Sequence, residues 1–170
     1  MTPEQTVLKN NDIIKDVCAF MIRKHGDQTD KVGKPYWMHP YRVMGYATKI
    51  IIDFELHGYV DYLDIAVAAD CHDLLEDTDT TIEELKELGV SDRAVEIIQT
   101  CTRKEDESYD EFIRRIGEDV GATIVKLADL EDNLDVKRFA GIRALDNQDR
   151  KRINKYLAAY NYLYNILDNI

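Results

Sequence analysis

The sequence predicts an all-α protein, a single bundle of about seven or eight helices, on three observations. Apolar residues recur at three- and four-residue spacing along most of the chain, whereas strict polar and apolar alternation is rare. Only 3 prolines and 8 glycines interrupt 170 residues, so long helices can form almost anywhere. Asn-Gly and Asp-Gly dipeptides, the strongest short signals of a β-hairpin, do not occur. We expect one domain over residues 1–170, without a linker or an internal repeat.

The helices of the first half can be placed from caps and from periodicity. Thr2 and Pro3 fit an N-cap followed by proline at the first helical position. Thr80 and Glu83 form a capping-box pair, and the helix that they open ends at Gly89. Periodicity alone predicts further helices over about residues 11–24, 40–54, 61–75 and, later in the chain, 122–136.

The helices of the second half begin at polar caps. Ser91 starts one helix, and Ser108 with Glu111 forms a second capping box. Asn147 caps the last helix, which runs nearly to the end of the chain. The connections between helices are short except for the polar segment 26–38, which we expect to be a loop.

Composition limits the kind of partner. Lys plus Arg total 22 and Asp plus Glu total 33, so the formal net charge is −11 and the pI is near 4.8. Such a chain repels a nucleic-acid backbone and an anionic membrane surface, so neither is expected as a partner. No apolar run is long enough to span a bilayer, and the N-terminus lacks a signal-peptide pattern. Cys18, Cys71 and Cys101 are too far apart for a CxxC motif and indicate buried thiols in a reducing compartment. We expect a soluble cytoplasmic protein, a monomer or homodimer, that acts on a small molecule.

Four residues have the types and the order expected of a metal site. His39 precedes a proline at a helix start, His72 and Asp73 form a doublet near a helix end, and Asp129 stands in an otherwise apolar helix. Burying unpaired carboxylates is costly, and a divalent cation held by these four side chains would offset that cost. A mixed nitrogen and oxygen ligand set suits Mn, Fe or Zn better than Ca or Mg.

Two further carboxylates follow the doublet at helical spacing. Residues four apart lie on one helix face, which places Glu76 beside His72 and Asp77 beside Asp73. Either carboxylate could hold a water molecule beside the metal and accept its proton. A bound divalent metal would lower the pKa of such a water molecule.

Ordinary explanations exist for each of these features taken singly. A lone His-Asp pair on a helix is usually a surface hydrogen bond, and the acidic run after Leu75 could be a solvated turn. Asp129 could serve a structural ion pair. The ordered set of His39, then His72-Asp73, then Asp129 favours the metal site.

This order resembles the signature of the HD-domain metal-dependent phosphohydrolases. The surrounding motifs are His25-xx-Gln28, Gly33-x-Pro35-Tyr36-xx-His39-Pro40-xx-Val43, His72-Asp73-xx-Glu76-Asp77-Thr78 and Val125-Lys126-Leu127-Ala128-Asp129-xxx-Asn133-Leu134. They are similar to the hydrolase domain of the RelA/SpoT family and to the small alarmone hydrolases, over about residues 17–160. Those enzymes remove the 3′-pyrophosphate from (p)ppGpp in a Mn²⁺-dependent reaction. No synthetase segment follows within residues 1–170, so we expect no pyrophosphokinase activity.

The resemblance assigns roles to particular residues. It implies that one divalent ion, Mn²⁺ with Fe or Zn as alternatives, is bound by His39, His72, Asp73 and Asp129. It implies that Glu76 and Asp77 form the catalytic pair that positions and activates the attacking water molecule. It also implies substrate contacts from Lys31, Asn133 and Tyr156. Lys126 is added because a phosphorylated substrate needs local positive charge in this acidic chain.

The chain departs from the family pattern at two acidic positions. Asp30 stands where the family has a basic residue that stacks on guanine. The segment before Asn133 is usually basic, apolar or aromatic in the family, but here it contains the acidic residues Glu131 and Asp132. We expect these changes to concern base recognition or pocket charge and not the metal. Asp30 motivates one alternative, an HD phosphohydrolase that acts on another nucleotide. The other alternative is a non-catalytic nucleotide-binding module. His25 is expected to support the loop or the pocket by a hydrogen bond rather than to bind metal.

Overall fold

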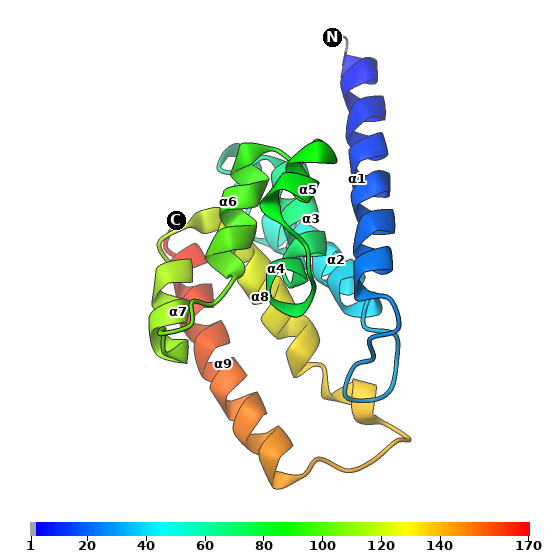
Figure 1. Ribbon diagram of the computed structural model, residues 1–170. Helices are drawn as coiled ribbons and strands as arrows, with labels where there is room; N and C mark the ends of the chain where they lie inside the picture. The colour runs from blue at the N-terminus through cyan, green and yellow to red at the C-terminus, as the bar shows by residue number, and fades with distance from the viewer. Residues whose placement is uncertain (1–2) are drawn as a thin grey trace.

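The structure, a computed structural model described for residues 3–170, confirms the all-α prediction (Figure 1). In that range the only β pairing is an isolated bridge between Thr29 and Pro35. The helices are α1 (Pro3–His25), α2 (Met38–Asp53), α3 (Tyr62–Cys71), α4 (Leu74–Asp77), α5 (Ile82–Glu87), α6 (Asp92–Cys101), α7 (Tyr109–Ile116), α8 (Val120–Leu134) and α9 (Asn147–Leu167), with the 3₁₀ segments η1 (Leu56–Gly58) and η2 (Val136–Phe139).

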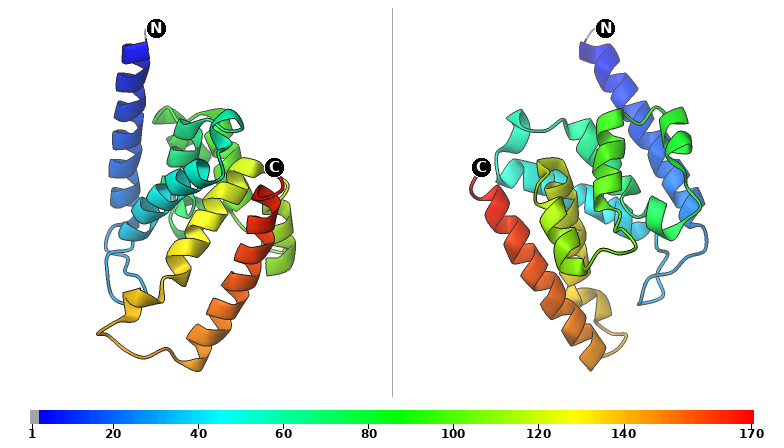
Figure 2. Two further views of the ribbon diagram at one scale, coloured as in Figure 1. Left: turned by 180° about the vertical axis from the view of Figure 1, so that it is seen from behind. Right: turned by 60° about the vertical axis from the view of Figure 1, so that its left-hand side comes forward.

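The centre of the bundle is formed by α2, α3 and α8. Helix α2 packs against both α3 and α8, and α9 lies along the other side of α8 (Figures 1 and 2). Small and branched side chains with no exposed surface fill this contact, among them Val43 and Ala47 on α2 and Ala68 on α3. None of the helices between residues 3 and 170 combines the length and apolar character that crossing a bilayer requires. The three cysteines are free, and Cys71 and Cys101 are buried.

Two of the predicted caps are wrong by one residue. Helix α5 is capped by Thr81 and Glu84, whose side chains each bond the other residue's backbone N–H, and not by Thr80 and Glu83. The Thr-x-x-Glu spacing occurs twice here, and the Thr80 hydroxyl is taken by Thr78 Oγ1 at 2.7 Å. Helix α9 is likewise capped by Asp146 instead of Asn147, in a capping box with Asp149. The predicted caps Ser91 and Ser108 are confirmed.

The single helix predicted over 61–75 is also wrong. Asp61 is its N-cap, but α3 ends at Cys71, and a one-turn helix, α4, begins after Asp73. His72 and Asp73 therefore lie in the turn between two helices, and the carbonyl of Asp73 accepts the amides of Glu76 and Asp77. His72 and Glu76, which we expected on one face of a single helix, therefore do not belong to a continuous helix.

The other helix boundaries differ less from the predicted ones. The helix predicted over 11–24 is the second part of α1, which begins at Pro3, and the predicted cap Thr2 lies outside the described residues. The helix predicted over 40–54 begins two residues earlier, at Met38. The helix predicted over 122–136 begins two residues earlier and ends at Leu134, with Asp119 as its cap.

The predicted loop between α1 and α2 is organised by Asp30. One carboxylate oxygen of Asp30 accepts the backbone amides of Val32 and Lys34, each at 2.9 Å. Gly33 closes the turn with φ +75°, a left-handed conformation that glycine adopts without steric cost. The loop therefore has a defined shape before it reaches His39 on α2.

Substituting two helical glycines by alanine should have opposite effects. A Cβ at Gly121 on α8 would lie 2.7 Å from Cδ1 of the buried Ile97, so Gly121→Ala should lower the free energy of unfolding by about 1–3 kcal/mol. A Cβ at Gly45 on α2 would lie in open space, so Gly45→Ala should raise the free energy of unfolding by about 0.5–1 kcal/mol. Urea unfolding followed by circular dichroism measures both, and a stabilising Gly121→Ala would contradict this packing of α6 on α8.

Candidate functional site

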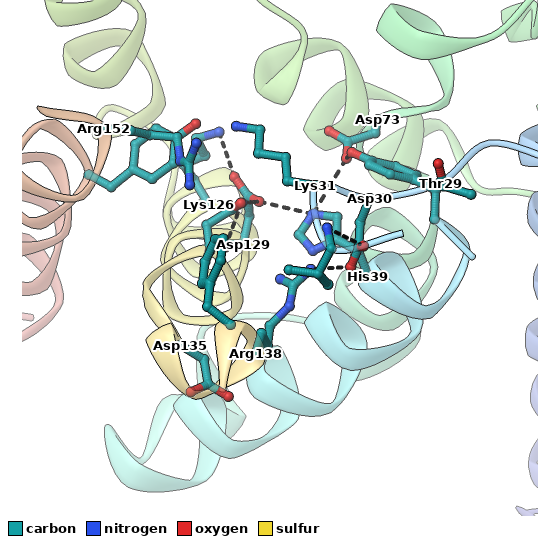
Figure 3. A pocket seen from close by; sticks show the side chains of 15 residues that line it. Thr29, Asp30, Lys31, His39, Asp73, Lys126, Asp129, Asp135, Arg138 and Arg152 are labelled. Carbon is teal, nitrogen blue, oxygen red and sulfur yellow. Dashed lines mark hydrogen bonds and ion pairs between the residues drawn. The ribbon is translucent and has the colours of Figure 1, made fainter. Parts of the chain in front are cut away.

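A cavity of about 320 Å³ opens between the loop that Asp30 organises, the start of α2 and the C-terminal part of α8. Helix α9 closes its far side (Figure 3). Seven of the residues predicted from the sequence line it: Lys31, His39, Asp73, Lys126, Asp129, Asn133 and Tyr156. His72 lies fully buried beside them, and Glu76 and Asp77 do not line this cavity.

The four predicted metal ligands converge on one point. His39 comes from the first turn of α2, His72 and Asp73 from the turn between α3 and α4, and Asp129 from α8. Nε2 of His39 lies 3.2 Å from Asp129 Oδ1 and 3.5 Å from Asp73 Oδ2. Nε2 of His72 lies 3.1 Å from the same Asp73 oxygen and 3.7 Å from the same Asp129 oxygen. Ligand atoms of His39, His72 and Asp129 all lie within 4.8 Å of one another, as a shared metal ion requires.

The outer nitrogen of each imidazole is already engaged. Nδ1 of His72 donates to the backbone carbonyl of Ala69 at 2.8 Å, and Nδ1 of His39 donates to Asp132 Oδ2 at 2.7 Å. Both rings therefore present Nε2 to the carboxylates, the nitrogen that would carry the free electron pair. Among the described residues, Nε2 of His72 makes no hydrogen bond although it is buried. This donor set fits a divalent cation.

The electrostatics of the cluster also indicate a cation. Burial alone would raise the pKa of Asp129, but the charge of Lys126 and the hydrogen bonds of His39 hold it well below its usual value. Burial alone would lower the pKa of His72, but Asp73 and Asp129 raise it to about 9. The carboxylates thus stay ionised and draw positive charge onto the rings. A divalent cation would displace that proton, since an imidazole binds metal in its neutral form.

Two residues predicted to contact substrate are bonded to Asp129. Lys126 Nζ lies 2.6 Å from Asp129 Oδ2, and Asn133 donates to Asp129 Oδ1 at 2.6 Å. Helical spacing of three and four residues on α8 produces both contacts. Their predicted role toward substrate stays a prediction, and their observed role is to orient this carboxylate.

Positive charge gathers on the opposite wall. Burial lowers the pKa of Lys31, and the nearby charge of Arg152 lowers it further. Arg152 lies on α9 one turn before Tyr156, and both line the cavity. The four-residue spacing of Arg152 and Tyr156 was the sequence signal that could have identified Arg152. This wall is suited to an anionic group.

Glu76 and Asp77 lie on α4, directly after Asp73. Glu76 Oε1 accepts the backbone amide of Arg103, and the carbonyl of Asp77 accepts the side chain of Gln28. Burial, and then the charge of Asp73, raises the pKa of both carboxylates. A carboxylate with a raised pKa beside a metal site can accept a proton, which is what the predicted role needs.

The motifs also contain supporting contacts that sequence reasoning assigned only in part. Tyr36 donates its hydroxyl hydrogen to Asp73 Oδ2 at 2.6 Å, a role that was not foreseen. His25 hydrogen-bonds Gln28 at 2.9 Å, as expected of a residue that supports the loop.

One acidic departure makes a contact that was not predicted. Asp132, expected to affect base recognition or pocket charge and not the metal, is hydrogen-bonded to His39, a predicted metal ligand. Its carboxylate is also bound by Arg42 and Arg138, which sequence reasoning missed. Asp30 is paired with Arg138 as well, at 2.6 Å. No sequence signal identifies these pairs, because Asp30 and Arg138 are 108 residues apart.

An all-α bundle with a buried His, His-Asp, Asp cluster is the arrangement of an HD-domain protein. No family model matches the chain. It is 33% identical over 129 residues, 71% of its length, to guanosine-3′,5′-bis(diphosphate) 3′-pyrophosphohydrolase of Aquifex aeolicus. It is 25% identical over 142 residues to the bifunctional (p)ppGpp synthase/hydrolase SpoT of Escherichia coli. The chain belongs to the HD-domain proteins of the RelA/SpoT type.

Two further facts qualify these similarities. The chain spans only 17% of the Aquifex protein and 19% of the Escherichia protein. In fold it is similar to a solved metazoan ortholog of SpoT, described as hydrolysing ppGpp, with a TM-score of 0.65 and 21% sequence identity. That likeness covers 92% of each chain and supports the HD-type bundle.

Metal binding at the cluster should stabilise the fold. At a Mn²⁺ concentration of about 100 times Kd, the native state gains about 2.7 kcal/mol, which raises Tm by about 5–10 °C in a chain of this size. His72→Ala should lose this shift, and the control His57→Ala, in η1 outside the cluster, should keep it. Thermal unfolding with MnCl₂ and with EDTA measures the shift. An equal shift in His72→Ala would show that the ion binds elsewhere.

Proposed function

We propose that this chain is a metal-dependent phosphohydrolase that removes the 3′-pyrophosphate from guanosine 3′,5′-bis(diphosphate) or a similar alarmone. The observation that carries the proposal is the cluster of His39, His72, Asp73 and Asp129, in which both Nε2 atoms face the carboxylates and three of the four residues line the cavity. The similarity to the Aquifex pyrophosphohydrolase supports the choice of substrate.

The proposed cofactor is one divalent ion, Mn²⁺, with Fe or Zn as alternatives. Two imidazoles and two carboxylates form a mixed set that suits these ions better than Ca or Mg. When bound, the ion supplies Lewis-acid polarisation of a phosphoryl oxygen and a lowered pKa for a water molecule.

The proposed catalytic groups are Glu76 and Asp77. Their position on α4, one turn beyond Asp73, puts them beside the cluster rather than among its ligands. One of them would accept the proton of the attacking water molecule as oxygen attacks phosphorus and the bond to the ribose 3′-oxygen breaks. The Arg103 amide fixes the direction of the Glu76 carboxylate, which leaves Glu76 Oε2 free of that bond.

The proposed substrate contacts come from the opposite wall. Lys31 and Arg152 supply positive charge for the phosphates in a chain of net charge −11. Tyr156 supplies an aromatic surface. Lys126 and Asn133 line the same cavity and are hydrogen-bonded to Asp129. A nucleotide is therefore the proposed partner, bound in the cytoplasm by a monomer or homodimer.

A second candidate keeps the chemistry and changes the nucleotide. Position 30 holds an aspartate, so it offers no basic side chain to stack on guanine. Its carboxylate is instead paired with Arg138. A non-catalytic binding module is the weaker candidate, because all six predicted ligand and catalytic positions hold their expected residues.

The deciding experiment is a nucleotide panel. Purified protein is incubated with ppGpp, pppGpp, pppApp, deoxynucleoside monophosphates and cyclic nucleotides, with Mn²⁺ and with EDTA, and products are identified by mass. Pyrophosphate and GDP from ppGpp, formed only with metal, would support the proposal. Turnover of another nucleotide alone would support the second candidate. Binding of nucleotide with no turnover of any would support the binding module.

Glu76→Gln should separate catalysis from metal binding. Loss of the proton acceptor is expected to lower kcat for ppGpp by about 10²–10⁴-fold, while the stabilisation by Mn²⁺ stays unchanged. Glu83→Gln, an exposed carboxylate in the first turn of α5, is the matched control and should keep full activity. Near-normal kcat in Glu76→Gln would remove this residue from the proposed mechanism.

A further inference from the structure

Asp132 is the most completely enclosed carboxylate of the site, with 1% of its surface exposed. It lies on α8 three residues after Asp129 and receives hydrogen bonds from three side chains. Its Oδ2 accepts one hydrogen bond from Nδ1 of His39 and one from Nη1 of Arg138, each at 2.7 Å. Arg42 donates to both oxygens, at 2.5 Å to Oδ1 and 3.0 Å to Oδ2.

Two guanidinium groups surround this buried carboxylate. Arg42 and Arg138 both donate to it from outside the cluster, so its negative charge is matched by direct partners. A buried carboxylate without such partners would be strongly unfavourable, which explains why both guanidinium groups are present. The side chain that faces Nδ1 of His39 is therefore an acceptor held in place by two cations.

The two cluster histidines are held in different ways. The ring of His72 is held by the backbone carbonyl of Ala69, a neutral acceptor that belongs to the helix itself. The ring of His39 is held by a charged side chain from another helix. A carboxylate acceptor fixes the proton on Nδ1, orients the ring and makes Nε2 a stronger electron donor.

We propose that Asp132 is a positioning residue for the metal site, which acts through His39 by holding its Nδ1 proton and aiming Nε2 at Asp129 and Asp73. Arg42 and Arg138 take part by holding the Asp132 carboxylate in place. This inference rests on the metal site of the proposed function and is independent of which nucleotide is the substrate.

The first test is the affinity for metal, measured by titration calorimetry with MnCl₂. Asp132→Asn keeps the shape of the side chain and removes its charge, and should weaken Mn²⁺ binding about 10–100-fold. Glu131→Gln is the matched control, because Glu131 is the neighbouring acid on α8 and contacts none of the ligands, so its Kd should stay that of the wild type. A Kd for folded Asp132→Asn within twofold of the wild type would overturn the proposal.

A double-mutant cycle separates positioning from general support of the fold. If Asp132 acts through His39, Asp132→Asn should change the Mn²⁺ affinity by less than twofold once His39→Ala has removed the ring. Electron paramagnetic resonance of free Mn²⁺ reaches the weak affinities of these variants. An equal loss in both backgrounds would show that Asp132 acts on the site as a whole, against the proposal.

A measurement on the wild-type chain covers the case in which a variant does not fold. In the Zn²⁺-loaded protein, which is diamagnetic, nitrogen NMR of His39 should show the metal on Nε2 and a hydrogen-bonded proton on Nδ1. Metal on Nδ1 would overturn the proposal. If the protein binds metal as proposed but does not hydrolyse ppGpp, the proposed function is overturned and the role of Asp132 is not. Absence of metal binding in the wild type would overturn both.

Discussion

The neutralisation of three enclosed carboxylates is the constraint on which the rest of the site depends. Asp129 and Asp132 are buried on one face of α8. The partly buried Asp73 approaches the same two imidazoles as Asp129, from the turn between α3 and α4. In a weakly polar interior each ionised carboxylate needs a donor or a cation, since a lone charge there is costly. The loop before α2, helix α2, helix α8 and η2 each supply one or more of these donors. The packing of α2 against α3 and α8 is therefore also what makes this charge tolerable.

That neutralisation divides the cavity into two chemical zones. The two imidazoles at its base, His39 in the lining and His72 buried behind it, already have their outer nitrogens bonded, to Asp132 and to Ala69, so only their inner nitrogens remain for a ligand. On the opposite wall, Lys31 and Arg152 both line the cavity, and Arg152 is held in place by an ion pair with Asp149 at 2.9 Å. Burial and the charge of Arg152 lower the pKa of Lys31, and an anion bound beside Lys31 would favour its charged form. A ligand with one phosphate at the His and Asp cluster and further negative charge beside Lys31 and Arg152 would match both zones.

Sequence reasoning succeeds where the decisive interactions are local. Ser91 and Ser108 are unambiguous caps, whereas Thr80 and Thr81 offer the same Thr-x-x-Glu spacing, and the spacing does not show that the Thr80 hydroxyl is already bonded to Thr78. The helix break after Cys71 carries no proline or glycine signal, because the charged cluster that holds the turn is assembled from other helices. That His39, His72, Asp73 and Asp129 come together could be predicted from their order along the chain. Their supports Arg42 and Arg138 could not, since each depends on a contact that spans 90 or 6 residues and has no fixed spacing.

The two acidic departures from the RelA/SpoT pattern are linked to each other. Arg138 lies 2.6 Å from Asp30 and 2.7 Å from Asp132, so one guanidinium binds both positions. With Arg42 on the second oxygen of Asp132, two acids face two arginines, and the pair of substitutions adds no uncompensated negative charge to the cavity. Loss of Arg138 would leave Asp30 without its only ion-pair partner among the described residues and Asp132 with one arginine fewer. The departures therefore act as one ion-pair network, which connects the shape of the loop before α2 to the orientation of His39.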